Sequence, residues 1–295
     1  MLKKSTNPIF NLVKPLFLCK ILLLFFIYPV YGKPLKLATW NIEWLLSPQD
    51  ALTYSHPRNI RLRNDKDFNE LRFFISKLNA DVIALQEIGS IQTLFPKDQY
   101  QFLITTDSTA QHSALAIRKG IFHSFTQWKD FTALSYVGVH HKVRSALDVT
   151  LYTQKSSLRL LVLHLKSGCS QNNLNTKKDA CEILEKQSHF LAQWIRERFE
   201  EKQPFLLLGD FNRVLSQDDR FFKNLSDFPI FLPTAKQATP CWGGNYFIDG
   251  FLLPMEVKRW FIDNSLKVLT FNNKNKNDQI KLSDHCPVSI SLDIP

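Results

Sequence analysis

The chain has 295 residues and a formal net charge of +10. It contains no internal repeat and no Gly/Ser-rich or Pro-rich linker, which excludes a repeat array and favours one large domain. The positive charge suits a polyanionic partner such as nucleic acid or an anionic membrane surface, although charge says nothing about fold.

The first 32 residues have the pattern of a signal peptide. Four lysines and no acidic residues accompany the apolar run Ile21–Val30, and Gly32 is a small residue suited to signal peptidase. An uncleaved anchor is the alternative, but this run is shorter than the ~20 residues of a transmembrane helix. We expect residues 1–32 to be removed and residues 33–295 to form a secreted or periplasmic catalytic domain. Loss of the four lysines would lower the net charge from +10 to +6.

Short apolar segments are the strand candidates, and several of them lack polar alternation. They are Leu35–Trp40, Val82–Leu85, Phe102–Thr105, Ala114–Arg118, Leu147–Tyr152, Leu158–His164, Phe205–Leu208, Phe247–Leu253 and Pro287–Leu292. Strands without alternation are buried on both faces, so helices must lie outside the sheets. The pattern favours an α/β or α+β sandwich.

Helical spacing of apolar residues predicts two helices. The first begins at Asp67, where Asp67 and Glu70 resemble a capping box, and the second runs from about residue 176 to residue 199. Residues 47–64 and 223–244 are predicted to be long loops, where substrate contacts are commonly found.

Polar side chains recur at the ends of the predicted strands. In chain order they are Asn41 and Glu43, Glu87, His164, Asp210 and Asn212, Asp249, and Asp284 with His285. A buried acid is costly unless a metal or hydrogen bonds compensate it, so these clusters predict one shared site with metal-assisted chemistry. Asp249 lies inside a buried strand, and His285 is the candidate partner that would form a proton-accepting pair with it. Glu87, with Asn41 or Asp284, offers the oxygen ligands that Mg²⁺ prefers.

Four cysteines follow residue 32, and an even number in an exported chain favours disulfides. Three pairings are possible. Cys169 and Cys181 flank a short polar loop, so we expect them to pair, which leaves Cys241 with Cys286. The absence of a C-x2-C spacing argues against zinc.

Taken in order, these motifs resemble the endonuclease/exonuclease/phosphatase superfamily over essentially all of residues 33–295. The segments that carry the resemblance are Thr39–Glu43, Asp81–Glu87, His164–Ser167, Gly209–Asn212, Ile248–Asp249 and Ser283–His285. Members include deoxyribonuclease-I-like nucleases, abasic-site endonucleases, sphingomyelinases and inositol polyphosphate 5-phosphatases. The resemblance implies a four-layer α/β sandwich with two central mixed β-sheets flanked by helices, and a site at one edge between the sheets.

The resemblance also implies a role for each motif residue. Glu87 would be the main Mg²⁺ ligand, with Mn²⁺ or Ca²⁺ as possible substitutes, and Asn41, Glu43 and Asp284 would complete the site. His285 would be a general base polarised by Asp249. Asp210 and Asn212 would orient the nucleophile and hold the phosphate, which Arg144 would also contact. His164 would bind the phosphate or act as a general acid. Lys166 and Arg213 flank the motifs and are candidate substrate contacts.

Departures from the family pattern bear on the choice of function. Deoxyribonuclease-type members pair the first histidine with an upstream Glu, whereas this chain has Gln111 or His112 there. The 5-phosphatase signatures are absent, because no Trp precedes Gly209 and no Arg follows Asp249.

The leading hypothesis is an exported, monomeric, Mg²⁺-dependent nuclease that hydrolyses DNA or RNA. The alternative is a phospholipid phosphodiesterase of the sphingomyelinase type or a phosphoinositide phosphatase. A membrane enzyme would need exposed aromatics, for which Trp242, Tyr246 and Phe247 are candidates. The intact acids and histidines argue against a non-catalytic subunit, and no protein partner is implied.

Overall fold

The computed structural model describes residues 33–89, 91, 94–135, 137, 142–225, 227, 229–241, 244–271 and 282–295. The expected signal peptide and Trp242 lie outside the described residues. Residues Lys33–Pro295 form one compact unit. Within the described ranges, no helix is long and apolar enough to span a membrane.

The first of two six-stranded sheets has the order β11-β12-β1-β2-β4-β3. Its strands are β1 (Leu35–Leu45), β2 (Val82–Ile88), β3 (Tyr100–Ile104), β4 (His112–Arg118), β11 (Lys267–Val268) and β12 (Val288–Leu292). Strands β1 and β2 are parallel and the other neighbours are antiparallel, so the sheet is mixed.

The second sheet repeats this plan in the order β5-β6-β7-β8-β10-β9. Its strands are β5 (Ser124–Gln127), β6 (Leu147–Tyr152), β7 (Ser157–His164), β8 (Phe205–Asp210), β9 (Ile230–Phe231) and β10 (Asp249–Pro254). Here β7 and β8 are the parallel pair. The predicted pair of central mixed sheets is therefore confirmed.

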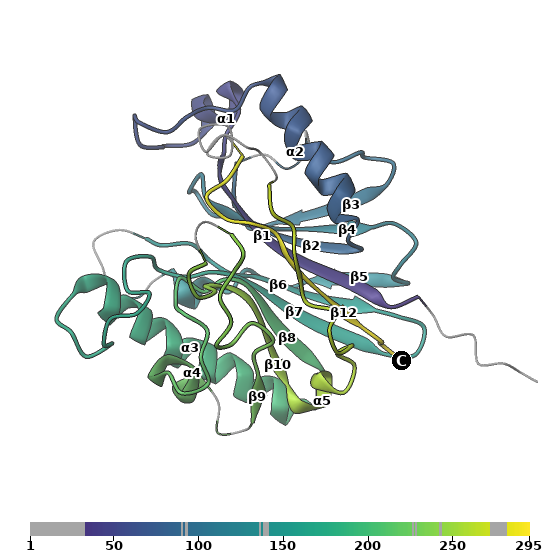
Figure 1. Ribbon diagram of the computed structural model, residues 1–295, viewed down its shortest axis with the longest axis vertical. Helices are drawn as coiled ribbons and strands as arrows, with labels where there is room; N and C mark the ends of the chain where they lie inside the picture. The colour runs from purple at the N-terminus through teal and green to yellow at the C-terminus, as the bar shows by residue number, and fades with distance from the viewer. Residues whose placement is uncertain are drawn as a thin grey trace, which may run out of the picture. The chain divides into compact units, whose positions relative to one another are not determined.

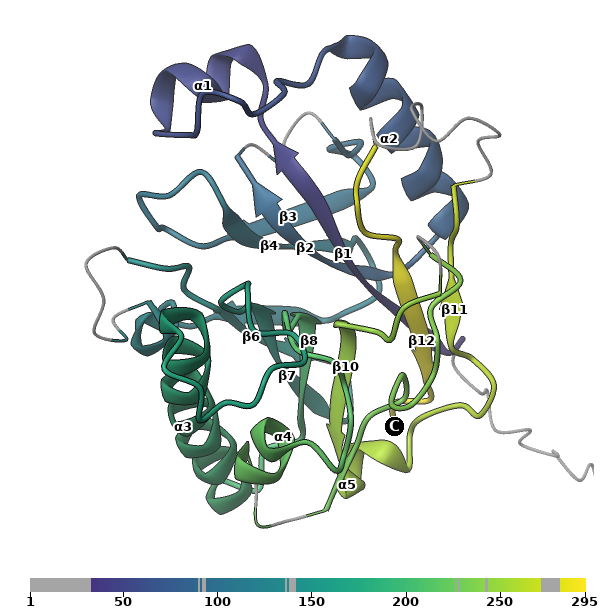
Figure 2. The ribbon, with the colours of Figure 1, turned by 60° about the vertical axis from the view of Figure 1, so that its left-hand side comes forward.

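Helices cover the outer face of each sheet, which completes the four layers (Figures 1 and 2). The described helices are α1 (Pro48–Thr53), α2 (Asp65–Leu78), α3 (Asp179–Glu200), α4 (Arg220–Leu225) and α5 (Met255–Lys258), with the 3₁₀ turn η1 at Thr132–Leu134. Helix α2 lies over the first sheet, and α3 with α4 lies over the second.

Strand β1 shows why the strands lack polar alternation. Leu35 and Leu37 belong to the apolar cluster that includes the second sheet, whereas Ala38 and Trp40 belong to the cluster that includes α2. Both faces of the strand are therefore buried, and successive side chains serve opposite layers.

The helix starts and the loops differ from the prediction. Asn64 is the N-cap of α2 and exchanges hydrogen bonds with Asp67, so the capping box is Asn64–Asp67 and the expected Asp67–Glu70 box is wrong. The segments expected to be loops contain short elements, α1 in the first and α4 and β9 in the second.

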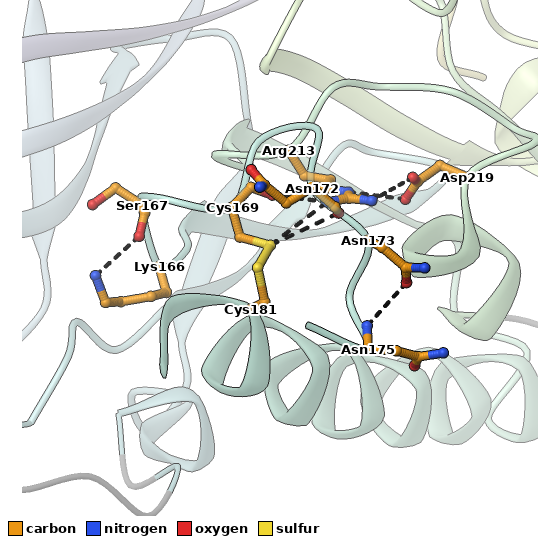
Figure 3. The surroundings of a disulfide bond; sticks show 9 residues. All are labelled: Lys166, Ser167, Cys169, Asn172, Asn173, Asn175, Cys181, Arg213 and Asp219. Atoms are coloured by element: carbon orange, nitrogen blue, oxygen red, sulfur yellow. Dashed lines mark hydrogen bonds and ion pairs between the residues drawn. A yellow bond between two sulfur atoms is a disulfide. The ribbon is translucent and has the colours of Figure 1, made fainter. Parts of the chain in front are cut away.

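Both expected disulfide pairings are present, Cys169–Cys181 and Cys241–Cys286. The first joins the loop after β7 to the start of α3, and Arg213 binds beside it (Figure 3). The Arg213 guanidinium donates to the carbonyl oxygens of Cys169, at 2.8 Å, and Asn172, at 2.6 Å. The second disulfide attaches the segment before β10 to the residue that follows His285.

Candidate active site

The polar side chains predicted to form one site come from the same edge of both sheets. The regular pairing of β1 with β2 is interrupted there, next to Asn41 and Glu87. Strands β7 and β8 end there with His164 and Asp210. The antiparallel β10 begins there, because Asp249 is opposite Asp210 in the register.

Asn41 links the two sheets. Its buried amide Nδ2 donates to Asp210 Oδ2 at 3.1 Å and lies 3.3 Å from Glu87 Oε1. Glu87 is oriented by a second bond, since the Trp44 backbone N–H donates to its Oε2 at 3.0 Å. Glu43 and Glu87 have positive φ angles of 47° and 62°, a region that is uncommon for residues other than glycine and that is often found at functional sites.

The carboxylates around Glu43 form a group that suits a divalent cation. Burial raises the pKa of Glu43, and the charge of Asp284 raises it further, although Arg63 offsets part of this effect. The Asp284 backbone N–H donates to Glu43 Oε2 at 3.0 Å, which holds the segments together. A bound cation would relieve the repulsion between these carboxylates, and Glu87, Glu43 and Asp284 offer the oxygen ligands that Mg²⁺ prefers. Asn41 instead turns its amide nitrogen toward Glu87, while its Oδ1 accepts from the Glu43 backbone N–H at 2.9 Å, so it orients the carboxylates.

Asp249 and His285 form the expected pair. His285 Nδ1 lies 2.7 Å from Asp249 Oδ2, while its Nε2 is 4.0 Å from Asp210 Oδ2 and 3.7 Å from Asp284 Oδ1. Burial alone would lower the pKa of His285, but the Asp249 carboxylate and the charges of Asp210 and Asp284 outweigh it and hold this pKa well above its usual value. Asp249 Oδ1 is buried and lacks a hydrogen-bond partner among the described atoms.

Ser283 positions His285, a contribution that we did not infer from the sequence. Its hydroxyl donates to the Asn41 carbonyl at 2.7 Å and accepts from the His285 backbone N–H at 2.9 Å. The Trp40 indole also donates to the His285 carbonyl at 3.0 Å. The only available sequence signal was the position of Ser283 in the Ser-Asp-His motif.

Asp210 is the most buried acid of the site. Burial, followed by the charge of Asp249, raises the pKa of Asp210 to about 7, while His285 and the bonds from Asn212 and Asn41 act in the opposite direction. The Asn212 backbone N–H donates to Asp210 Oδ1 at 2.8 Å, and its Nδ2 lies 3.1 Å from Asp210 Oδ2. Gly209 is required before this turn, because a Cβ there would lie 2.1 Å from the Leu163 carbonyl oxygen.

Metal ligation by Asp210, Asp249 and His285 is a second possibility, since one ligand atom from each lies within 4.8 Å of the others. We favour the group around Glu87, because Mg²⁺ prefers oxygen and His285 Nδ1 is already bonded to Asp249.

His164 lies against the Arg144 guanidinium. Arg144 Nη2 is 2.6 Å from His164 Nε2 and donates to the Leu165 carbonyl at 3.0 Å. His164 Nε2 is also 3.5 Å from Glu87 Oε1 and 3.7 Å from Asp210 Oδ2. Burial, together with the charges of Arg144 and His285, lowers the pKa of His164 well below its usual value, so the ring is neutral near pH 7. The upstream candidate His112 instead contacts the Thr105 hydroxyl at 3.3 Å.

The two remaining substrate candidates lie differently. Lys166 is half-buried, and its ammonium donates to the Ser167 carbonyl at 2.9 Å (Figure 3). Arg213 is buried and forms a two-point ion pair with Asp219, with its closest N–O distance 2.6 Å. Its guanidinium therefore faces the disulfide loop.

A cavity of about 400 Å³ opens beside the Asp249–His285 pair. Its wall contains neutral polar residues and aromatic residues, which we did not predict as a group from the sequence. These include Ser170, Gln171, Thr239, Asn245, Tyr246 and Phe247, together with both cysteines of the second disulfide.

Comparison with known proteins identifies the fold. Neither a search of family models nor a search of curated proteins finds a match. Solved structures do match: a humanised D. rerio TDP2 is 15% identical with a TM-score of 0.57, covering 88% of this chain and 99% of that chain. The 3′ phosphatase NExo from Neisseria, bound to a product DNA hairpin, is 16% identical with a TM-score of 0.57, covering 88% and 100%. The human Nocturnin catalytic domain, with a bound sulfate anion, is 15% identical with a TM-score of 0.53, covering 88% and 93%.

The chain therefore shares the four-layer α/β fold of these structures, which is the fold that the motif resemblance to the endonuclease/exonuclease/phosphatase superfamily implied. The resemblance seen in its motifs and the similarity of its structure agree.

Proposed function

We propose that this protein is an exported, Mg²⁺-dependent phosphodiesterase that hydrolyses nucleic acid. The proposal rests on three groups of residues that meet at one sheet edge. They are a candidate general base with its carboxylate partner, a group that could bind phosphate, and a group of oxygen ligands. The candidate general base is His285, whose Nδ1 lies 2.7 Å from Asp249 Oδ2. Its other ring nitrogen, Nε2, lies 4.0 Å from Asp210 Oδ2.

In this proposal His285 Nε2 accepts a proton from the attacking water, which requires the ring to be neutral. The neighbouring carboxylates raise the pKa of His285, and a cation bound beside Asp284 would offset that effect and favour the neutral ring. Asp249 fixes the ring through Nδ1 and stabilises the positive charge that the ring acquires. Asp210 and Asn212 orient the water and the phosphate, while Arg144 and neutral His164 donate hydrogen bonds to phosphate oxygens. Glu87, Glu43 and Asp284 would hold a bound Mg²⁺, which would polarise the phosphate and stabilise the leaving oxygen, and Asn41 would orient Glu87.

Several features support nucleic acid as the substrate. Formal net charge is +10 for the whole chain and +6 without the expected signal peptide, which favours a polyanion. Lys166 is a half-buried cation on the loop that follows His164. Among the similar structures, NExo from Neisseria and D. rerio TDP2 were solved with DNA products. Export is supported by the two disulfides, which persist in oxidising compartments.

The test is a turnover panel with plasmid DNA, single-stranded DNA, RNA and sphingomyelin, each with Mg²⁺ and with excess EDTA. We expect Mg²⁺-dependent cleavage of at least one nucleic acid and a rate lower by about 10²-fold or more for His285→Ala. Phosphocholine release without nucleic-acid cleavage would instead establish the lipid phosphodiesterase, and activity in EDTA would exclude the metal.

A further inference from the structure

The cavity beside His285 has the size and the position of a specificity pocket. Its volume of about 400 Å³ lies within the range of small-ligand sites, roughly 300–1,000 Å³. Asp249, Asp284 and His285 belong to its wall. Whatever part of the substrate is attached to the reacting phosphate therefore has this cavity within reach.

The chemistry of the cavity wall favours a flat, neutral, polar ring. Tyr246 lies in the cavity wall and is 54% exposed, so its side chain is accessible to a stacking partner. Gln171 and Asn245 contribute side-chain amides, and Ser170 and Thr239 contribute hydroxyls. Amides and hydroxyls both donate and accept hydrogen bonds, as the edge of a nucleobase does.

Each of the two disulfides holds a segment of the wall. Ser170 and Gln171 follow Cys169, whose bond to Cys181 ties this loop to α3, and the Ser170 carbonyl accepts from the Val214 backbone N–H at 2.9 Å. On the other side, Cys241 is bonded to Cys286, next to His285. Binding to a wall that is already ordered requires little further loss of conformational entropy.

We propose that this cavity binds an unpaired nucleobase next to the scissile phosphate, with Tyr246 as its stacking surface. The inference rests on the proposed function and specifies its substrate as single-stranded or frayed nucleic acid. A paired base inside a duplex is stacked between its neighbours and cannot enter a cavity without being unpaired. A quaternary ammonium headgroup is less well matched, since it is typically enclosed by several aromatic faces, whereas Phe247 is only 4% exposed.

The experiment is a double-mutant cycle between Tyr246 and the base. Two single-stranded oligonucleotides are identical except that one nucleotide, next to the mapped cleavage position, is replaced by a stable abasic analogue. Wild-type protein, Tyr246→Ala and Tyr246→Phe are assayed with Mg²⁺ on both. Phe73→Ala is the matched control, because Phe73 lies on α2 and is 53% exposed.

We expect Tyr246→Ala to lower kcat/KM on the intact oligonucleotide by roughly 10-fold or more, as loss of one base–aromatic stack predicts. It should leave the abasic oligonucleotide unaffected, while Tyr246→Phe and Phe73→Ala behave like wild type on both. Three outcomes would overturn this inference but leave the proposed function standing: equal losses on both substrates, no loss on either, or preferential cleavage of the abasic substrate. If wild type cleaves no nucleic acid, the proposed function fails and the inference fails with it.

Discussion

At the scale of single residues, Asp249 and His285 stand 36 positions apart in the chain, yet their side chains share a 2.7 Å bond. Since Asp249 acts through the His285 ring, the two should behave as one unit. His285→Ala should lower kcat/KM on an oligonucleotide by about 10²–10⁴-fold, which is the usual contribution of a general base. The double variant with Asp249→Asn should be little worse than His285→Ala, because effects within one catalytic unit are not additive.

His189→Ala is the control for this prediction, since His189 is an exposed histidine on α3. It should retain wild-type rates. If the fold-losses in kcat/KM of Asp249→Asn and His285→Ala multiply in the double variant, the two residues act separately. Wild-type turnover by His285→Ala would show that His285 is not the general base.

Glu87 is the residue on which the metal assignment depends. Glu87→Gln keeps the size of the side chain but removes a negative charge from the oxygen-ligand group. We expect it to raise the Mg²⁺ concentration needed for half-maximal cleavage and to reduce the rise in Tm that Mg²⁺ produces, because binding to the native state stabilises it. Glu182→Gln, at an exposed position on α3, should change neither quantity.

The thermal measurement does not depend on turnover, so it locates the ion even in an inactive variant. An unchanged Mg²⁺-induced Tm shift in Glu87→Gln, together with a lost shift in Asp249→Asn, would place the ion at the group formed with Asp210 and His285.

At the scale of elements, the sequence predicted the strands that are buried on both faces and missed the short ones. Strand β9 and strand β11 are two residues long, and β5 is partly exposed, so none carries a continuous apolar run. Helix α1 was missed because it is only six residues long, although Ser47, Pro48 and Asp50 form a typical helix start. Short elements are determined by tertiary contacts that a local pattern does not contain.

The positions of the site residues at strand ends could be predicted, but the way in which the sheets face each other could not be derived from local patterns. The bond between Asn41 and Asp210 crosses from one sheet to the other, and that arrangement was supplied by the family resemblance. Arg213 shows that proximity in the sequence to a site residue does not place a side chain in the site. It follows Asn212 directly, yet its side chain is buried against Asp219 and the carbonyls of the disulfide loop.

The Cys169–Cys181 disulfide should stabilise the loop that joins β7 to α3. It connects residues 12 positions apart, for which the chain-entropy model gives about 3 kcal/mol. Replacing both cysteines by Ala should lower the free energy of unfolding by that order in a denaturant titration. KM should rise as well, because Ser170 and Gln171 lie in the cavity wall. An unchanged unfolding midpoint would show that Arg213 and its carbonyl partners hold the loop without the covalent bond.

At the scale of the whole molecule, charge should govern how tightly nucleic acid binds. Neutralising phosphates releases condensed counterions, so the logarithm of the association constant should fall linearly as the logarithm of salt concentration rises. His285→Ala is the suitable background, since binding of a labelled single strand can then be followed by fluorescence anisotropy without cleavage. Lys166→Ala in this background should reduce the magnitude of the slope by about one, which is the loss of one phosphate contact.

Lys77→Ala is the matched control, because Lys77 lies in the last turn of α2 and stacks over Phe73, 4.4 Å from the ring centroid. Removing it takes away the same charge at a different place and should leave the slope unchanged. Equal reductions by Lys166→Ala and Lys77→Ala would mean that only total charge matters and that the strand has no fixed path past the His164 loop. A slope near zero in every variant would argue against a polyanionic substrate altogether, since a neutral or zwitterionic lipid headgroup releases few counterions on binding.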